Sequence, residues 1–374
     1  SRPLILRETI WSKGREAIKQ ELDKYAEEYK AMFERQAPLA NQPKTMLPTD
    51  PKNIWMEGIG LIGLGANAKA ASIAGDLAVQ NARVRAIGED AGGFRPISEK
   101  DLFDCEYWSL EQAKLGKGAP PKFQGKIVMI TGGSGTIGFA IAEAFSKLGA
   151  QTVLVDKDET TLKKAITKLG HGHGYFPIDV TEADAANQAM LAAIQNFGGL
   201  DILVSNAGAA HAGPMLSISN DELRSAFELN FFSHYSFSTA AAKILKNQNR
   251  GGQILFNISK QAVNPGRNFG AYGLPKATTF FLMRQLALEL GSDGIRVNGV
   301  NADRIRSGLL TDDFISSRAK SRGVSESEYM AGNLLGKEVT AEHVADAFTS
   351  LACAESTTGH VMTVDGGNVE ASLR

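Results

Sequence analysis

The sequence predicts an α/β fold in which a doubly wound parallel sheet follows an N-terminal helical arm and a small α/β unit. From residue 121 onward, short apolar runs alternate with helical stretches, which is typical of consecutive βαβ units. A glycine-rich turn joins the first of these runs to a helix. The length of 374 residues also exceeds what one small core requires. We therefore expect three parts: a helical arm and loop at 1–50, a small α/β unit and linker at 51–120, and the sheet domain at 121–374.

The composition is that of an ordinary globular protein with a small-molecule ligand. Hydrophobic residues make up 43% and charged residues 22% of the chain, and the formal net charge is -1 without any basic block. This balance gives no support for nucleic acid or an anionic membrane as a partner. The first residues do not resemble a secretory signal, and no apolar run reaches the roughly 18 residues of a membrane span. Since Cys105 and Cys353 have neither a disulfide pattern nor metal-ligand spacing, we expect a cytoplasmic protein.

The arm carries one long amphipathic helix. Ile18, Leu22, Tyr25 and Tyr29 recur every three or four residues within the charged segment 12–37, which puts them on one face. A loop rich in helix breakers and turn formers follows. Because the arm has too few apolar residues for a core of its own, we expect it to pack against the sheet domain or a neighbouring subunit.

The small α/β unit contains a glycine motif that has two interpretations. A strand or strand pair is expected at 53–64 and an alanine-rich helix at 67–88. Gly58-Ile59-Gly60-Leu61-Ile62-Gly63 matches Gly-x-Gly-x-x-Gly, which cradles phosphate where it joins a strand to a helix in a βαβ unit. No acidic residue ends a second strand about 20 residues later, because that region is helical. We therefore favour a tight strand-to-helix turn over a phosphate site. An aromatic segment at 102–115 and a linker at 116–121 complete this part.

The sheet domain is predicted from apolar strands that helical stretches separate. The strands expected from these runs are Ile127–Ile130, Thr152–Val155, Ile202–Val204, Gln253–Asn257, Arg296–Val300 and Val361–Val364. Right-handed crossovers bring the carboxyl ends of parallel strands to one edge, where ligands bind. The pattern predicts a Rossmann-like sheet with its site at that edge.

The first strand of this domain runs into a dinucleotide-binding turn. The turn and the start of the following helix comprise Thr131, Gly132, Gly133, Ser134, Gly135, Thr136, Ile137 and Gly138. Asp156 ends the second strand, where a carboxylate accepts hydrogen bonds from the adenosine ribose and repels a 2′-phosphate. NAD is therefore the expected cofactor in preference to NADP. Two alternatives remain: Asp156 is an ordinary turn residue, or Lys157 beside it holds a 2′-phosphate.

Further polar residues follow the later strands in a fixed order. Asp179 and Val180 follow the third strand, and Asn206, Ala207 and Gly208 follow the fourth. Asn230 lies in a helix, Ser259 follows the fifth strand, and the motif Tyr272-Gly273-Leu274-Pro275-Lys276 comes next. With the glycine turn, this order resembles the short-chain dehydrogenase/reductase superfamily throughout residues 125–374.

The spacing of Tyr272 and Lys276 has a physical reason. Helical residues four apart lie one above the other, so the Lys276 ammonium is expected beside the Tyr272 phenol. A neighbouring ammonium lowers the pKa of a phenol and makes the phenolate a usable base near neutral pH. The resemblance implies that Tyr272 is the general acid/base and that Lys276 also holds the nicotinamide ribose.

The resemblance also implies the remaining roles in catalysis. Ser259 would hydrogen-bond the reacting oxygen, Asn230 would order a water that relays protons to Lys276, and Ile305 and Ser307 would contact the nicotinamide. The hydride chemistry itself belongs to the cofactor.

Three positions depart from the usual family pattern. Thr136 replaces a glycine of the phosphate turn, and Gly135 comes one place earlier. Counting back from Tyr272 assigns the catalytic serine to Ser259, whereas alignment on Asn257 puts Lys260 there. After the sixth strand, Arg304 and Arg306 indicate either an anionic ligand or salt bridges with Asp312 and Asp313.

A narrower resemblance covers nearly the whole chain. The segments 101–115, 257–265 and 301–310 look like the dehydrogenase half of bifunctional rhamnulose-1-phosphate aldolase/lactaldehyde (alcohol) dehydrogenases. This resemblance implies a short hydroxy-aldehyde or its alcohol as substrate, with a zinc-dependent aldolase module ahead of the region. All six histidines lie at or after His171, so we expect neither aldolase activity nor a metal.

The resemblance further implies a homodimer or homotetramer in which the helices that carry Asn230 and Tyr272 pair. The competing functions are a catalytically retired NAD-binding module, an interaction scaffold built on the arm, and a dehydrogenase for a different sugar-derived alcohol.

Overall fold

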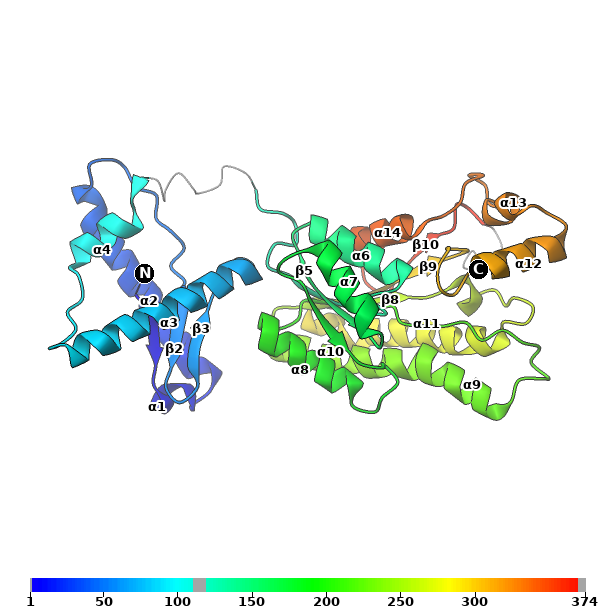
Figure 1. Cartoon of the computed structure of the whole chain (residues 1–374), viewed down its shortest axis with the longest axis horizontal. Helices are drawn as coiled ribbons and strands as arrows, with labels where there is room; N and C mark the ends of the chain where they lie inside the picture. The colour runs from blue at the N-terminus through cyan, green and yellow to red at the C-terminus, as the bar shows by residue number, and fades with distance from the viewer. Residues whose placement is uncertain (1, 110–118, 369–374) are drawn as a thin grey trace. The chain divides into compact units, whose positions relative to one another are not determined.

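The computed structural model describes residues 2–109 and 119–368, which form two compact units, one up to Pro121 and one from Lys122 on (Figure 1). The N-terminal unit has a three-stranded sheet of β1 (Leu4–Leu6), β2 (Asn53–Met56) and β3 (Gly60–Gly63). β1 pairs with β2 in parallel, and β2 pairs with β3 antiparallel. Its helices are α1 (Glu8–Trp11), α2 (Arg15–Gln36), the 3-10 helix η1 (Ala37–Leu39), α3 (Ala68–Asp90) and α4 (Glu99–Glu106).

The predicted arm and the predicted small α/β unit share one set of packing contacts. Tyr25 of α2 is buried with Leu4 and Leu6 of β1, and Tyr29 is buried with Phe103 and Tyr107. The hydroxyls of Tyr29 and Tyr107 are 2.8 Å apart. The expectation that α2 needs the sheet domain or another subunit is therefore wrong, because α4 and β1 cover its apolar face.

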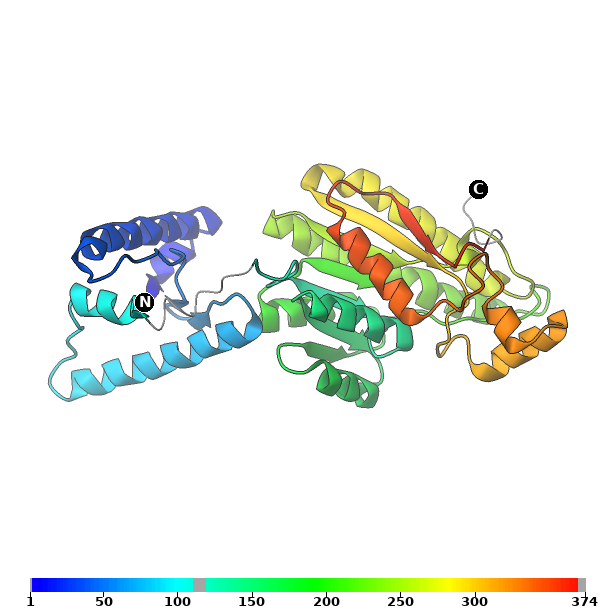
Figure 2. The same ribbon diagram turned by 90° about the horizontal axis from the view of Figure 1, so that it is seen from above.

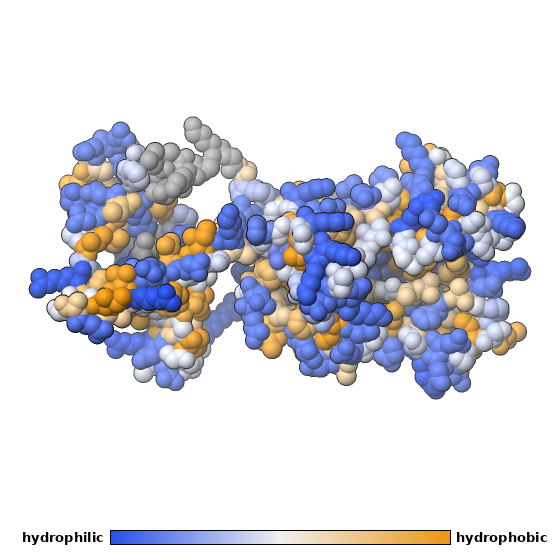
Figure 3. Space-filling model, viewed as in Figure 1, coloured by the Kyte–Doolittle hydropathy of each residue, from blue (hydrophilic) through white to orange (hydrophobic). Residues whose placement is uncertain are grey.

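Helix α3 keeps an apolar surface. Ile73, Leu77, Val84 and Ile87 are each at least half exposed, and Figure 3 shows apolar side chains gathered on the N-terminal unit. The predicted aromatic segment is helical up to Glu106. Residues 110–115 of that segment and residues 116–118 of the predicted linker lie outside the described residues.

The first glycine motif belongs to a β-hairpin. Gly58 and Gly60 have φ of 76° and 136° and connect the antiparallel strands β2 and β3, while Gly63 ends β3. The prediction of a tight strand-to-helix turn is thus corrected, since the first two glycines provide the left-handed backbone of a hairpin turn. The βαβ context that a phosphate cradle requires is not formed here.

The C-terminal unit is built on a seven-stranded, wholly parallel sheet, which confirms the predicted fold class (Figures 1 and 2). The strands in spatial order are β10 (Val361–Val364), β9 (Ile295–Ala302), β8 (Gly252–Asn257), β7 (Ile202–Ser205), β4 (Ile127–Thr131), β5 (Gln151–Asp156) and β6 (Gly174–Pro177). The chain builds outward from β4 to β6 and then returns to the other side of β4. This reversal creates a crevice at the carboxyl ends of β4 and β7.

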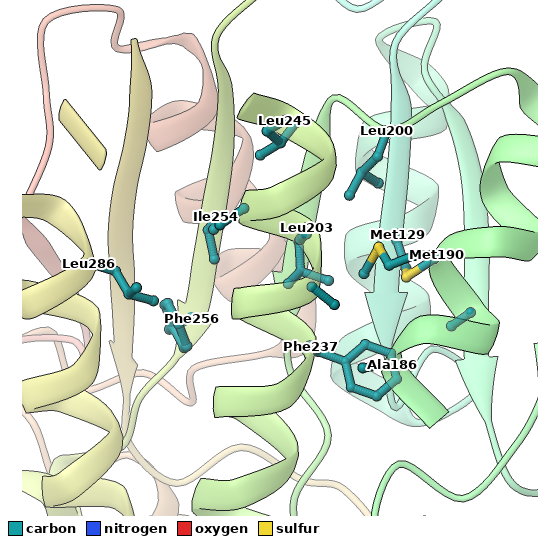
Figure 4. Close-up of a cluster of buried hydrophobic side chains, with 14 of the residues drawn as sticks. Met129, Ala186, Met190, Leu200, Leu203, Phe237, Leu245, Ile254, Phe256 and Leu286 are labelled. Atoms are coloured by element: carbon teal, nitrogen blue, oxygen red, sulfur yellow. The ribbon is translucent and has the colours of Figure 1, made fainter. Parts of the chain in front are cut away.

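Helices cover both faces of the sheet. On one face lie α6 (Thr136–Lys147), α7 (Glu159–Leu169) and α14 (Ala341–Cys353), and on the other lie α8 (Ala185–Phe197), α10 (Ser233–Gln248) and α11 (Gly270–Leu290). Met129, Leu203 and Ile254 of adjacent strands meet Phe237 of α10 and Leu286 of α11 in the second core (Figure 4). These apolar strands hold the polar residues at their ends in fixed positions.

The remaining elements lie around the carboxyl edge of the sheet and its connections. They are α9 (Asn220–Phe227), the π-helix η2 (Glu228–Phe232), the 3-10 helices η3 (Lys260–Ala262) and η4 (Gly291–Asp293), α12 (Asp312–Arg322) and α13 (Glu326–Met330). In the described parts of the chain, every helix is too short or too polar to cross a bilayer.

Candidate active site

A cleft of about 1700 Å³ opens at the carboxyl edge of the parallel sheet. Most of the residues that the sequence singled out line it. These are Gly132, Gly135, Thr136, Ile137, Gly138, Asp156, Lys157, Asp179, Val180, Asn206, Ala207, Gly208, Ser259, Tyr272, Lys276, Ile305 and Ser307. The four that do not line it are Thr131, Gly133, Ser134 and Asn230. The structure thus brings together residues that lie up to 175 positions apart, Gly132 to Ser307.

The glycine turn between β4 and α6 leaves room and free amides for an anionic group. Gly132 has φ of 63°, and a Cβ on it would come within 3.0 Å of the Ala207 Cα. Helix α6 begins at Thr136, and its N-cap Gly135 offers no side chain to the first amides. Helix N-termini of this kind bind phosphates through their amides and the helix dipole. The turn therefore fits the pyrophosphate of a dinucleotide.

Asp156 and Lys157 lie at the end of β5, where the adenosine ribose is expected. The Asp156 carboxylate accepts hydrogen bonds from the Ser134 hydroxyl at 2.7 Å and from the Ser134 amide at 3.3 Å. The Lys157 ammonium forms an ion pair with Asp179 at 3.8 Å. Ser134 therefore orients Asp156 from behind, and Lys157 is directed toward a carboxylate of the next strand end.

A chain of hydrogen bonds ties the ends of three strands to Lys276. The Thr131 hydroxyl accepts the Asn206 and Ala207 amides at 2.9 and 3.0 Å, and the Asn206 side-chain amide donates to the Thr131 carbonyl. The Asn257 amide donates to the Asn206 side-chain oxygen at 2.8 Å, and the Lys276 ammonium donates to the Asn257 carbonyl at 3.0 Å. Lys276 is thereby fixed relative to the sheet.

Ser259, and not Lys260, meets the tyrosine. The Ser259 side chain forms a hydrogen bond with Tyr272, and both residues line the cleft. The buried Lys260 ammonium lies 3.6 Å from the Asp303 carboxylate instead. Of the two residues that the spacing left open, only Ser259 shares a hydrogen bond with Tyr272.

The charges at Tyr272 and Lys276 differ from the simple expectation. Burial raises the pKa of Tyr272, although the hydrogen bond with Ser259 opposes this shift. Burial also lowers the pKa of Lys276 to about 7. The expected lowering of the Tyr272 pKa is therefore wrong for the cofactor-free cleft, because removal from water outweighs the neighbouring ammonium.

Asn230 supports the site from behind, on the π-helix η2. Its side-chain amide donates to the carbonyls of Ala209 and Ala226, and its side-chain oxygen accepts the Ala209 amide. The Thr279 hydroxyl donates to the Asn230 carbonyl at 2.7 Å. These contacts join η2 to the loop after β7 and to α11, and the water relay implied by the resemblance stays a prediction.

His234 is a buried neighbour of Lys276 that the sequence analysis missed. Its Nε2 lies 3.3 Å from the Lys276 Nζ, and its Nδ1 lies 2.6 Å from the Ser205 hydroxyl. Burial and then the charge of Lys276 lower the pKa of His234 well below its usual value, so it is neutral beside the ammonium. The only signal in the sequence is a lone histidine one helical turn after Asn230.

The loop after β9 keeps its two arginines in ion pairs. Arg306 contacts Asp312 at 2.5 Å and Glu338 at 2.8 Å, and Arg304 contacts Asp303 at 3.5 Å. Of the two explanations that the sequence left open, the structure shows the salt bridge to Asp312.

Burial of Lys276 predicts a pH-dependent stability. Its pKa is 10.5 unperturbed and about 7 in the folded protein, so the unfolded state binds an extra proton between these values. The free energy of unfolding therefore rises with pH in this window, and the cost of burying the charge applies in full below pH 7. We expect Lys276→Met, without cofactor, to melt above the wild type near pH 6 and to lose this advantage toward pH 10. A melting-temperature difference that is constant over pH would contradict the shift.

Two family matches cover the two units separately. Residues 133–368 match the family described as enoyl-(acyl carrier protein) reductase, and residues 1–115 match the family described as aldolase class II, second domain. The narrower resemblance predicts an aldolase module ahead of this region, whereas residues 1–115 themselves match an aldolase family.

Among curated proteins, the uncharacterized oxidoreductase YuxG of Bacillus subtilis is 31% identical over 372 residues. The match covers 96% of this chain and 53% of YuxG, so the chain spans about half the length of that relative. Short-chain dehydrogenase reductase 3b of Arabidopsis thaliana is 30% identical over 66% of this chain and 96% of its own length.

Solved structures match the C-terminal unit. A 3-ketoacyl-(acyl-carrier-protein) reductase from Brucella melitensis, complexed with NADH, is 26% identical with a TM-score of 0.58 and covers 65% of this chain and 98% of its own. A short-chain type dehydrogenase/reductase from Mycobacterium marinum is 27% identical with a TM-score of 0.59 and covers 66% of this chain and 96% of its own.

Proposed function

This chain belongs to the short-chain dehydrogenase/reductase family of oxidoreductases, and we propose that it transfers hydride between NAD and a short hydroxy-aldehyde or its alcohol, with lactaldehyde as the leading candidate. The observation that carries the proposal is the hydrogen bond between Ser259 and Tyr272 in the cleft that Lys276 also lines. A nucleotide-binding module without catalysis would not require these three side chains together. We also expect a cytoplasmic homodimer or homotetramer.

The bound nicotinamide supplies the hydride chemistry, and the protein supplies orientation and proton transfer. The amides at the start of α6 fit the pyrophosphate, and Asp156 fits the adenosine ribose. Ser259 donates a hydrogen bond to the reacting oxygen and holds it beside Tyr272. During oxidation the Tyr272 phenolate takes the hydroxyl proton, and during reduction the phenol returns it.

An aldehyde reaches the acid level in the same site through its hydrate. The hydrate carries a hydroxyl on the reacting carbon, so Tyr272 takes that proton as the C–H bond gives up its hydride, which leaves a carboxylic acid. No cysteine nucleophile is needed, and Cys105 and Cys353 do not line the cleft.

The carboxylate of Asp156 predicts the choice of cofactor. In the proposed complex a 2′-phosphate would meet this negative charge, so kcat/KM for NAD should exceed that for NADP. We expect Asp156→Ser to reduce this preference by about tenfold or more, since it removes a charge-assisted contact with the ribose. Lys157→Met is the matched variant and should leave the ratio unchanged. Equal use of both cofactors by the wild type would contradict the assignment.

A substrate panel tests the proposed substrate. Activity with lactaldehyde, propane-1,2-diol and longer polyols, measured in both directions, should be highest for the three-carbon compounds. A strong preference for a bulky steroid or fatty substrate would remove the substrate proposal and leave the family assignment intact.

A further inference from the structure

One arginine in the cleft has no partner for its charge. Arg318 of α12 lines the same cleft as Ser259 and Tyr272 and is half-buried. Among residues 2–109 and 119–368, no ion pair or hydrogen-bond acceptor contacts its guanidinium, and its buried Nε is unsatisfied. A buried N–H group without an acceptor costs free energy, so such groups normally have one.

The neighbouring cations differ from Arg318 in this respect. Arg304 pairs with Asp303, Arg306 pairs with Asp312 and Glu338, and Lys157 pairs with Asp179. The role of an anion contact that the sequence suggested for Arg304 and Arg306 therefore falls to a residue that sequence patterns did not single out.

Two aromatic rings fix the position of the Arg318 guanidinium. Its Cζ lies 5.4 Å from the ring centre of Phe269 and 5.9 Å from that of Phe314, and the two rings meet edge to face at 5.8 Å. Rings attract a guanidinium through their faces and use none of its N–H donors. Phe269 is also the N-cap of α11, three residues before Tyr272, and its carbonyl accepts the Tyr272 amide at 3.1 Å. The guanidinium is thus held rigidly on the wall that also carries the catalytic tyrosine.

We propose that Arg318 forms an oxyanion subsite in the substrate half of the cleft and binds the carboxylate or phosphate of a short hydroxy compound. Its planar fork matches the oxygens of either group, and the aromatic wall leaves the fork free to bind them. The inference rests on the proposed function: if the enzyme oxidises a short hydroxy-aldehyde, the carboxylate is that of its acid product. The ring contacts place the subsite next to the segment before Tyr272, on the opposite strand connection from the pyrophosphate turn.

Binding of small anions to the enzyme–NADH complex tests the subsite without requiring turnover. Bound NADH occupies the amides at the start of α6, so added lactate or hydroxyacetone phosphate reports on the rest of the cleft. We expect Arg318→Met to weaken the binding of lactate, of hydroxyacetone phosphate, or of both by about tenfold to a hundredfold, as expected for a lost charged hydrogen bond. The affinity for neutral propane-1,2-diol should not change. The two anions distinguish a carboxylate subsite from a phosphate subsite.

Arg322→Met is the matched control. Arg322 is one helical turn further along α12, also lines the cleft, and lies over the Tyr329 ring, but it is exposed. Arg322→Met should leave anion binding unchanged, and Arg318→Lys, which keeps the charge, should retain part of it. Unchanged anion binding in Arg318→Met, or an equal loss in Arg322→Met, would overturn the subsite. If lactaldehyde is not turned over but anions bind in an Arg318-dependent way, the proposed substrate fails and the subsite stands.

Discussion

Tyr272→Phe is expected to lower kcat by roughly a hundredfold or more and to leave NAD binding nearly unchanged. The substitution keeps the buried ring and removes only the hydroxyl that bonds with Ser259 and transfers the proton. Steady-state kinetics and titration of NAD binding measure the two quantities separately.

Tyr235→Phe provides the control for this substitution. Tyr235 is a half-exposed tyrosine of α10 that does not line the cleft, so its variant should keep full activity. Retention of wild-type turnover by Tyr272→Phe would contradict the assignment of the general acid/base.

Lys276→Ala is expected to damage turnover and cofactor affinity together. The ammonium belongs to the hydrogen-bond chain through Asn257 and Asn206, and the resemblance gives it the nicotinamide ribose as a further ligand. We expect kcat to fall by about a hundredfold and the dissociation constant of NAD to rise by about tenfold, the loss typical of a charged hydrogen bond.

Lys243→Ala, at an exposed position of α10, is the matched control and should change neither quantity. A loss of turnover with normal NAD affinity in Lys276→Ala would mean that Lys276 does not hold the cofactor. That result would confine the residue to proton transfer.

The features that could be predicted from the sequence are those that local patterns encode. Apolar runs at regular spacing fix the strands, and parallel topology then brings the residues after them to one edge. Tyr272 and Lys276 are four apart on one helix, so their proximity follows from helical geometry. Strand ends and helix faces therefore gave most of the candidate site.

Other features depend on packing between distant elements. His234 meets Lys276 because α10 and α11 lie side by side, and Arg318 meets Phe269 because α12 folds back toward α11. The raised pKa of Tyr272 depends on how completely its surroundings exclude water, which no sequence spacing encodes. The hairpin at Gly58 was misread because the same glycines suit a left-handed turn between antiparallel strands as well as a turn into a helix.

The most direct test of the central proposal follows the hydride itself. Lactaldehyde that carries deuterium on its aldehyde carbon is incubated with the protein and NAD, and the NADH and acid product are analysed by mass spectrometry. We predict NADH that contains deuterium and lactate in equal amount, with both products depending on Tyr272. NADH without deuterium, or no NADH at concentrations at which lactaldehyde binds, would contradict hydride transfer from this substrate.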